Sequence, residues 1–147
     1  MLTNADIAEL TAFRRTLHRF PEVSRQEAQT ASRVTAALRP LNPAAIVTGL
    51  GGHGVAAVWD FGPGPSALFR CELDALPIEE VSTADHRSTV PGTAHLCGHD
   101  GHITILLALA RLIARTPPSS GRVILMFQPA EEDGSGAAAV IADPAYE

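Results

Sequence analysis

Residues 121–129 read GRVILMFQP, an apolar run with the length of one β-strand, bounded by glycine and proline. A strand that lacks alternating polar residues is typical of the centre of a sheet covered on both faces. We therefore expect a central strand here. Immediately before it, residues 103–115 (ITILLALARLIAR) are apolar almost all round, as in a helix that packs into a larger body.

Two amphipathic helices are expected in the N-terminal third of the chain. The first follows a cap at Asn4 or Thr3, after which apolar residues recur at helical spacing. The second covers residues 25–38, because Ser24 and Glu27 have the spacing of a capping box. Both helices are expected to lie on the surface of the domain.

Three short segments predict further strands: AAIVTGL (44–50), GVAAVWDF (54–61) and SALFRCELD (66–74). The GPGPS turn at 62–66 predicts that the second and third form an antiparallel hairpin. Since helices and strands alternate along the chain, the expected fold class is α/β, with a mixed sheet between helical layers.

The composition excludes several classes of function. Eleven basic against sixteen acidic residues give a net charge of −5, which argues against nucleic-acid binding. The sequence contains no lysine, so Schiff-base chemistry and a P-loop are excluded. Two cysteines, Cys71 and Cys97, and the absence of a signal peptide or a membrane-length apolar run indicate a cytoplasmic protein that does not bind membranes.

The segment HLCGHDGH at 95–102 carries three histidines, one cysteine and one aspartate. One glycine separates Cys97 from His99, so in an extended loop their side chains would point the same way and could bind one metal ion. Asp100 could cap the following helix or hold a histidine in one tautomer. The alternative is a polar loop that caps a helix, but this density of ligands favours a metal site.

The paired carboxylates of PAEED (129–133) form a second candidate cluster. Glu131 and Glu132 follow an uncharged strand abruptly, and adjacent carboxylates repel each other unless a cation neutralises them. In a turn, one could bind the metal while the other accepts a proton from water. A solvated acidic turn is the alternative. A third candidate is Asp74, at the end of a predicted strand two residues after Glu72, where an orienting or ligating acid fits.

These motifs resemble those of the metal-dependent N-acyl-amino-acid amidohydrolases, the group of hippurate hydrolase and the plant auxin-conjugate hydrolases. That group belongs to the aminoacylase and carboxypeptidase superfamily. LHRFPEVSRQE, GVAAV, FRCELDALPIEE, HLCGHDGH and FQPAEE follow one another in the order of that family, over essentially the whole chain. The resemblance implies the N-terminal part of a dinuclear zinc-exopeptidase-like catalytic domain. Glu72 stands where the family usually has aspartate.

The resemblance also implies a role for each candidate residue of the site. Cys97, His99 and Glu132 would bind two divalent ions (Zn, Mn, Co or Ni), with the Cys97 thiolate as the bridge. Glu131 would be the general base and Asp74 an acid beside the site. A water activated by the metal would lose its proton to Glu131 and attack the amide of an N-acyl amino acid.

The resemblance implies that residues 1–147 are only the N-terminal portion of the catalytic domain, without the lid or dimerisation domain and without the C-terminal catalytic segment. One hypothesis is therefore a hydrolase that acts as a homo-oligomer or with a complementing chain. Another is a truncated, non-catalytic remnant or half-enzyme that binds a metal or a partner chain. A cysteine hydrolase using Cys97 and a histidine is a weaker alternative, because it leaves the paired glutamates unexplained.

Overall fold

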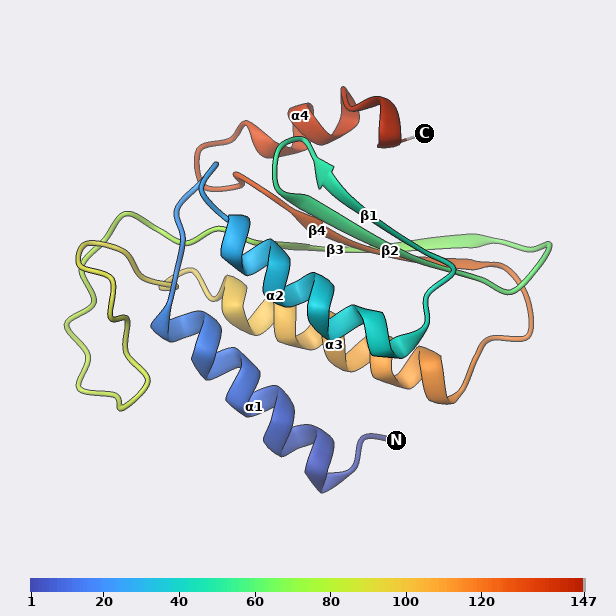
Figure 1. Ribbon diagram of the computed structural model, residues 1–147, viewed down its shortest axis with the longest axis horizontal. Coiled ribbons are helices and arrows are strands. Elements are labelled where there is room, and N and C mark those ends of the chain that lie inside the picture. Colours follow the sequence, from blue (N-terminus) through green and yellow to red (C-terminus); the bar gives the residue numbers. More distant parts are fainter. Residues whose placement is uncertain (147) are drawn as a thin grey trace.

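A four-stranded mixed sheet, with three helices packed on one face, organises the chain (Figure 1). The structure is a computed structural model that describes residues 1–146. The elements in chain order are α1 (Asn4–Arg19), α2 (Ala28–Leu38), η1 (Arg39–Leu41), β1 (Ala45–Leu50), β2 (Gly54–Asp60), β3 (Ser66–Glu72), α3 (His99–Arg115), β4 (Arg122–Gln128), α4 (Gly136–Ile141) and η2 (Pro144–Tyr146).

Strand β4 is central, as its apolar run predicts. The strand order is β1-β2-β4-β3, so β4 pairs on both sides. Phe127 lies opposite Val55 of the antiparallel neighbour β2 and opposite Cys71 of the parallel neighbour β3. The parallel pair matters for function, because the carboxyl ends of β3 and β4 meet at the same edge of the sheet.

The predicted hairpin between the second and third strands is wrong. Strand β2 pairs with β1 and β4, and β3 pairs only with β4. The GPGPS turn passes over the start of β4 instead, where Gly121 donates a hydrogen bond to the carbonyl of Gly62 and Arg122 donates one to that of Pro65. Strand β4, with its apolar run from Val123 to Phe127, takes the place between them and has a paired strand on each side.

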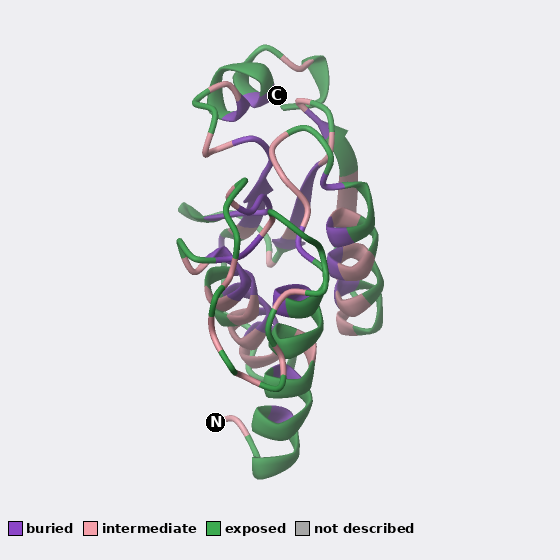
Figure 2. Ribbon diagram, turned by 90° about the vertical axis from the view of Figure 1, so that its left-hand side faces the viewer, coloured by how far each residue is buried: buried purple, intermediate pink, exposed green. Residues whose placement is uncertain are grey.

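The sheet lies between helical layers, as the sequence predicts, but it is covered more completely on one face than on the other. Helices α1, α2 and α3 enclose the main core against β2, β3 and β4 (Figures 1 and 2). On the opposite face, α4 covers a small cluster of Leu50, Ala56, Met126 and Val140. An open groove of about 310 Å³ runs beside it along the sheet.

Helix α1 begins as predicted and is tied to α3. Thr3 and Asp6 form a complete capping box, in which the Asp6 carboxylate accepts the Thr3 N–H at 2.7 Å. The same carboxylate accepts two hydrogen bonds from Arg115 and one from Arg111 at 2.8 Å. These bonds, with that of Arg115 the strongest, hold the pKa of Asp6 well below its usual range.

We expect the stability contribution of Asp6 to depend on pH. A carboxylate whose pKa is lowered on folding stabilises the protein above its unfolded pKa of about 3.9, and that contribution is lost as the pH falls toward the folded pKa. Asp6→Asn should therefore lower the free energy of unfolding near pH 7 and make progressively less difference below about pH 4. Urea unfolding between these pH values measures this, and a pH-independent difference would contradict it.

The start of α2 differs from prediction in a way that reaches the functional site. Helix α2 begins at Ala28, three residues later than expected, and Ser24 does not cap it. The carboxylate of Glu22 accepts the N–H groups of Gln29 and Thr30 instead. Ser24 and Glu27 are thereby free to contact residues far away in the sequence.

No helix in residues 1–146 has both the length and the apolar character needed to cross a membrane.

Candidate metal centre

Residues from both predicted clusters meet beyond the carboxyl ends of β3 and β4, at the start of α3. Cys97, His99 and Glu132 each offer a ligand atom, and these three atoms lie within 4.8 Å of one another. Crevices outside the carboxyl ends of parallel strands are where open α/β sheets place their sites. The structure thus brings together the three residues that the sequence suggested as ligands.

The hydrogen bonds of His99 leave one ring nitrogen available for a metal. Its Nδ1 lies 2.7 Å from the backbone carbonyl of Asp74. A carbonyl can only accept, so Nδ1 carries the proton and Nε2 of the neutral ring presents a lone pair. His99 is nearly fully buried, with 3% of its surface exposed. A backbone carbonyl that orients an imidazole in this way is a common support of metal-binding histidines.

Three carboxylates surround the Nε2 atom of His99. It lies 3.7 Å from oxygens of Glu131 and Glu132 and 3.9 Å from Oε2 of Glu72. These separations are too long for hydrogen bonds but match ligands that share one cation, since each metal–ligand bond is about 2.0–2.2 Å long. Oε1 of Glu132 is also buried and lacks a hydrogen-bond partner within residues 1–146. The donor set of thiol, imidazole and carboxylate fits a divalent transition metal.

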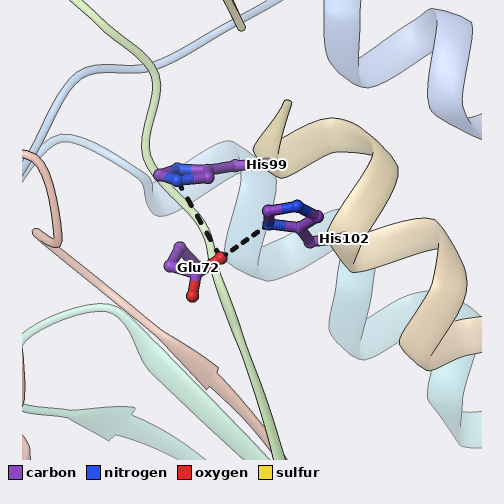
Figure 3. A group of neighbouring side chains, drawn as sticks. All are labelled: Glu72, His99 and His102. Atoms are coloured by element: carbon purple, nitrogen blue, oxygen red, sulfur yellow. Dashed lines mark hydrogen bonds and ion pairs between the residues drawn. The ribbon is translucent and has the colours of Figure 1, made fainter. Parts of the chain in front are cut away.

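Glu72 forms a second group with His99 and His102 (Figure 3). Oε2 of Glu72 lies 2.9 Å from Nδ1 of His102, and Oε1 is paired with Arg70 at 2.8 Å. The Cys97 group and the Glu72 group both need Nε2 of His99. Because one nitrogen lone pair binds one ion, only one of the two groups can use His99 at a time.

Cys97 reaches the site through a turn rather than an extended loop, which corrects the predicted local geometry. Gly98 lies between Cys97 and His99 with φ of 96° and is the N-cap of α3. That left-handed conformation favours glycine. A hydrogen bond to Glu132 raises the pKa of the exposed Cys97 thiol, and burial and the nearby carboxylates add to the effect. A bound cation would act in the opposite direction and favour the thiolate.

Asp74 is fully buried and holds the two sides of the site together. Its backbone carbonyl accepts from His99, while Oδ2 accepts the N–H of Glu132 at 2.9 Å and the hydroxyl of Ser24 at 2.7 Å. Oδ2 thus holds the backbone of Glu132 in place, whereas Oδ1 is buried without a hydrogen-bond partner within residues 1–146.

The chain is similar to known proteins in both sequence and structure. Residues 68–147, more than half of the chain, match the family model described as peptidase family M20/M25/M40. The chain belongs to this family. Among curated proteins, the M20 chain is 37% identical over 138 residues to IAA-amino acid hydrolase ILR1-like 5 of Arabidopsis thaliana, covering 90% of this chain and 30% of that protein. It is 38% identical over 140 residues to N-acetyl-L-cysteine deacetylase of Bacillus subtilis, covering 92% and 33%.

Solved structures give the same result for the M20 fold. The crystal structure of Bacillus subtilis YxeP, described as a dinuclear metal-binding peptidase of the M20 family, superposes with a TM-score of 0.88 at 33% identity. The match covers 95% of this chain and 40% of that structure. The M20 chain therefore spans about a third of the length of these two curated relatives and 40% of the solved one. The match to the M20 family confirms the resemblance drawn from the sequence motifs, and the mixed sheet with its helices confirms the predicted α/β class.

Other histidines of the HLCGHDGH segment of the M20 chain lie outside the Cys97 group. His95 is buried, and burial lowers its pKa to about 4. Asp100 does hold a histidine, but it is His18 of α1, at 2.9 Å from Nδ1, and the same oxygen accepts from Arg14. Density of ligands in the sequence thus overstated how many residues the site contains.

Sequence reasoning missed the residues that support the paired glutamates of the M20 chain. Ser24 binds Asp74, and Glu27 accepts the N–H of Ala130, 103 positions away in the sequence. The spacing of Ser24 and Glu27 predicts a helix cap instead. The only available signal was a pair of polar residues within a motif of the family, and it does not specify a partner.

Proposed function

We propose that this M20 chain is the N-terminal portion of the catalytic domain of a metal-dependent hydrolase that cleaves the amide bond of N-acyl amino acids. The observation that carries the proposal is Nε2 of His99, buried and held by Asp74, with its lone pair directed among the groups of Cys97, Glu131 and Glu132. The names of the relatives, an amino acid conjugate hydrolase and an N-acetyl deacetylase, support the substrate class.

Cys97, His99 and Glu132 are the proposed ligands of divalent metal. Thiolate and imidazole suit zinc, cobalt or nickel, and the carboxylates admit manganese. When bound, such an ion polarises the amide carbonyl and makes a water molecule acidic enough to deprotonate near neutral pH. In the two-ion arrangement that the resemblance implies, the Cys97 thiolate would be one of the groups that hold the ions.

Glu131 is the proposed general base. Its carboxylate lies 3.7 Å from Nε2 of His99, and 39% of its side chain is exposed, whereas the side chain of Glu132 is 17% exposed. Glu131 is thus the more accessible member of the pair. It would take a proton from water and pass it to the leaving amine. Asp74 supports this reaction as a positioning residue, because its hydrogen bonds orient both His99 and Glu132.

Three ligands cannot saturate two ions that each need three or four protein ligands. We infer that the remaining ligands come from protein outside residues 1–146. They could belong to the same longer polypeptide, to a second copy of the chain or to a complementing chain. A half-enzyme that binds metal without turnover is therefore the second candidate function. It is favoured by the ligand count of the Cys97 group.

Hydrolysis of a panel of N-acyl amino acids, with added zinc or manganese, tests the proposal. We expect metal-dependent turnover that falls by about 100- to 10,000-fold in Glu131→Gln, because a general base contributes that much. Metal binding by Glu131→Gln should stay close to that of the wild type, which separates loss of the base from loss of the ion. A folded chain that binds metal but does not turn over supports the half-enzyme, and a chain that binds no metal contradicts both.

A further inference from the structure

The turn after β4 needs a backbone conformation that its residue does not favour. Ala130 lies between the end of β4 and the paired glutamates, and its φ is 49°. A residue with a Cβ atom is disfavoured in this left-handed region, so contacts from elsewhere in the protein must hold it there. The conformation of Ala130 sets the direction in which Glu131 and Glu132 leave the strand.

Glu27 makes such a contact. Its Oε1 accepts the N–H of Ala130 at 2.8 Å and the N–H of Arg25 at 2.9 Å. Arg25 is also left-handed, with φ of 66°, and its guanidinium lies 2.9 Å from the carboxylate of Asp133. One carboxyl oxygen therefore joins two left-handed residues, one before α2 and one after β4.

The helix that follows does not explain why Glu27 is buried. Glu27 occupies the N-cap position of α2, yet its side chain makes no cap hydrogen bond, and Glu22 accepts from the first turn instead. The side chain of Glu27 is completely buried. Oε2 has no hydrogen-bond partner within residues 1–146. Burying a carboxyl group costs free energy. The two hydrogen bonds that Oε1 accepts are therefore the reason we give for the buried position of Glu27.

We propose that Glu27 is a positioning residue of the metal centre. It holds Ala130 in the left-handed conformation, and Asp74 holds the N–H of Glu132 on the other side of the turn. Glu131 lies between two fixed amides, with its carboxylate directed toward His99. The inference rests on the proposed function, because the direction of these carboxylates matters only if a cation binds between them.

Three variants of the 147-residue chain test this role. Glu27→Met removes the acceptor but keeps the length of the side chain, whereas Glu27→Gln retains one oxygen that can accept both N–H groups. Ala130→Gly supplies a residue that adopts the left-handed conformation without support. Two readouts are needed: hydrogen exchange of the Ala130 amide by NMR, and cobalt affinity from the thiolate-to-cobalt absorption band.

We expect Glu27→Met to speed Ala130 exchange by at least about tenfold, since it removes a bond to a carboxyl group. Cobalt affinity should fall by about 10- to 100-fold, as when other partners behind metal ligands are removed. Glu27→Gln should change both much less. Adding Ala130→Gly to Glu27→Met should restore most of the lost affinity. If Glu27 supported only the fold, Ala130→Gly would not restore the cobalt affinity that Glu27→Met loses.

The outcomes separate this inference from the proposed function. A wild-type chain that does not bind cobalt overturns the proposed function, and the positioning role with it. If the wild type binds cobalt and Glu27→Met binds it equally well, only the positioning role is overturned, even if Ala130 exchanges faster. Should Glu27→Met fail to fold, Ala130→Val decides: a β-branched residue strongly resists this conformation, so unchanged cobalt affinity would overturn the inference.

Discussion

Replacing His99 by alanine should lower the cobalt or zinc affinity of the chain by at least about 100-fold. His99 belongs to both groups of side chains that could bind a metal. Of its two ring nitrogens, Nδ1 is hydrogen-bonded to Asp74 and Nε2 is left for the metal. Without it, Cys97 and Glu132 remain as two ligands, which is too few to bind an ion tightly. Titration with cobalt, followed by absorption, measures the loss.

His102→Ala is the matched control for this experiment. His102 lies in the same helical turn, and its side chain is half exposed. If the cation lies among Cys97, His99 and Glu132, His102→Ala should change the affinity far less than His99→Ala and leave the sulfur-to-cobalt band intact. Equal losses in both variants, without that band, would instead place the cation in the group of Glu72 and His102 (Figure 3).

The features that could be predicted from the sequence are those set by neighbouring residues. The uncharged run of β4 identified the central strand, and a capping residue at Asn4 or Thr3 marked the start of α1. The strand order was mispredicted because it depends on pairing across long stretches of chain. A tight GPGPS turn favours a hairpin locally, but it cannot show that β4, some fifty residues later, lies between the two strands.

The same distinction holds in the site. Cys97 and His99 are two residues apart, and adjacent glutamates after an apolar strand are conspicuous, so both clusters could be recognised. Their supports could not be recognised, because Ser24 and Glu27 act on partners 50 and 103 positions away. A serine and a glutamate three residues apart have the same spacing whether they cap a helix or orient a distant loop. Only the fold distinguishes the two.

Phe127→Ala should destabilise the fold more than any substitution in the metal centre, at about 3–5 kcal/mol of unfolding free energy. Phe127 is completely buried on β4, on the face that α1, α2 and α3 cover, between Val55 and Cys71 of the neighbouring strands. Truncation removes most of a large apolar side chain and leaves a cavity that three packed helices cannot fill by a small movement. Urea unfolding measures the difference.

Ile124→Ala on the same strand is the control, because it tests the asymmetry of the sheet and not only the size of the side chain. Ile124 points to the opposite face, where it is half-buried and lines the open groove. Its truncation should cost about 1–2 kcal/mol, since part of the side chain already contacts water. A sheet covered equally on both faces would give similar losses at the two positions. Because a domain of this size is stable by about 5–15 kcal/mol in total, the loss at Phe127 alone would remove a large part of its stability.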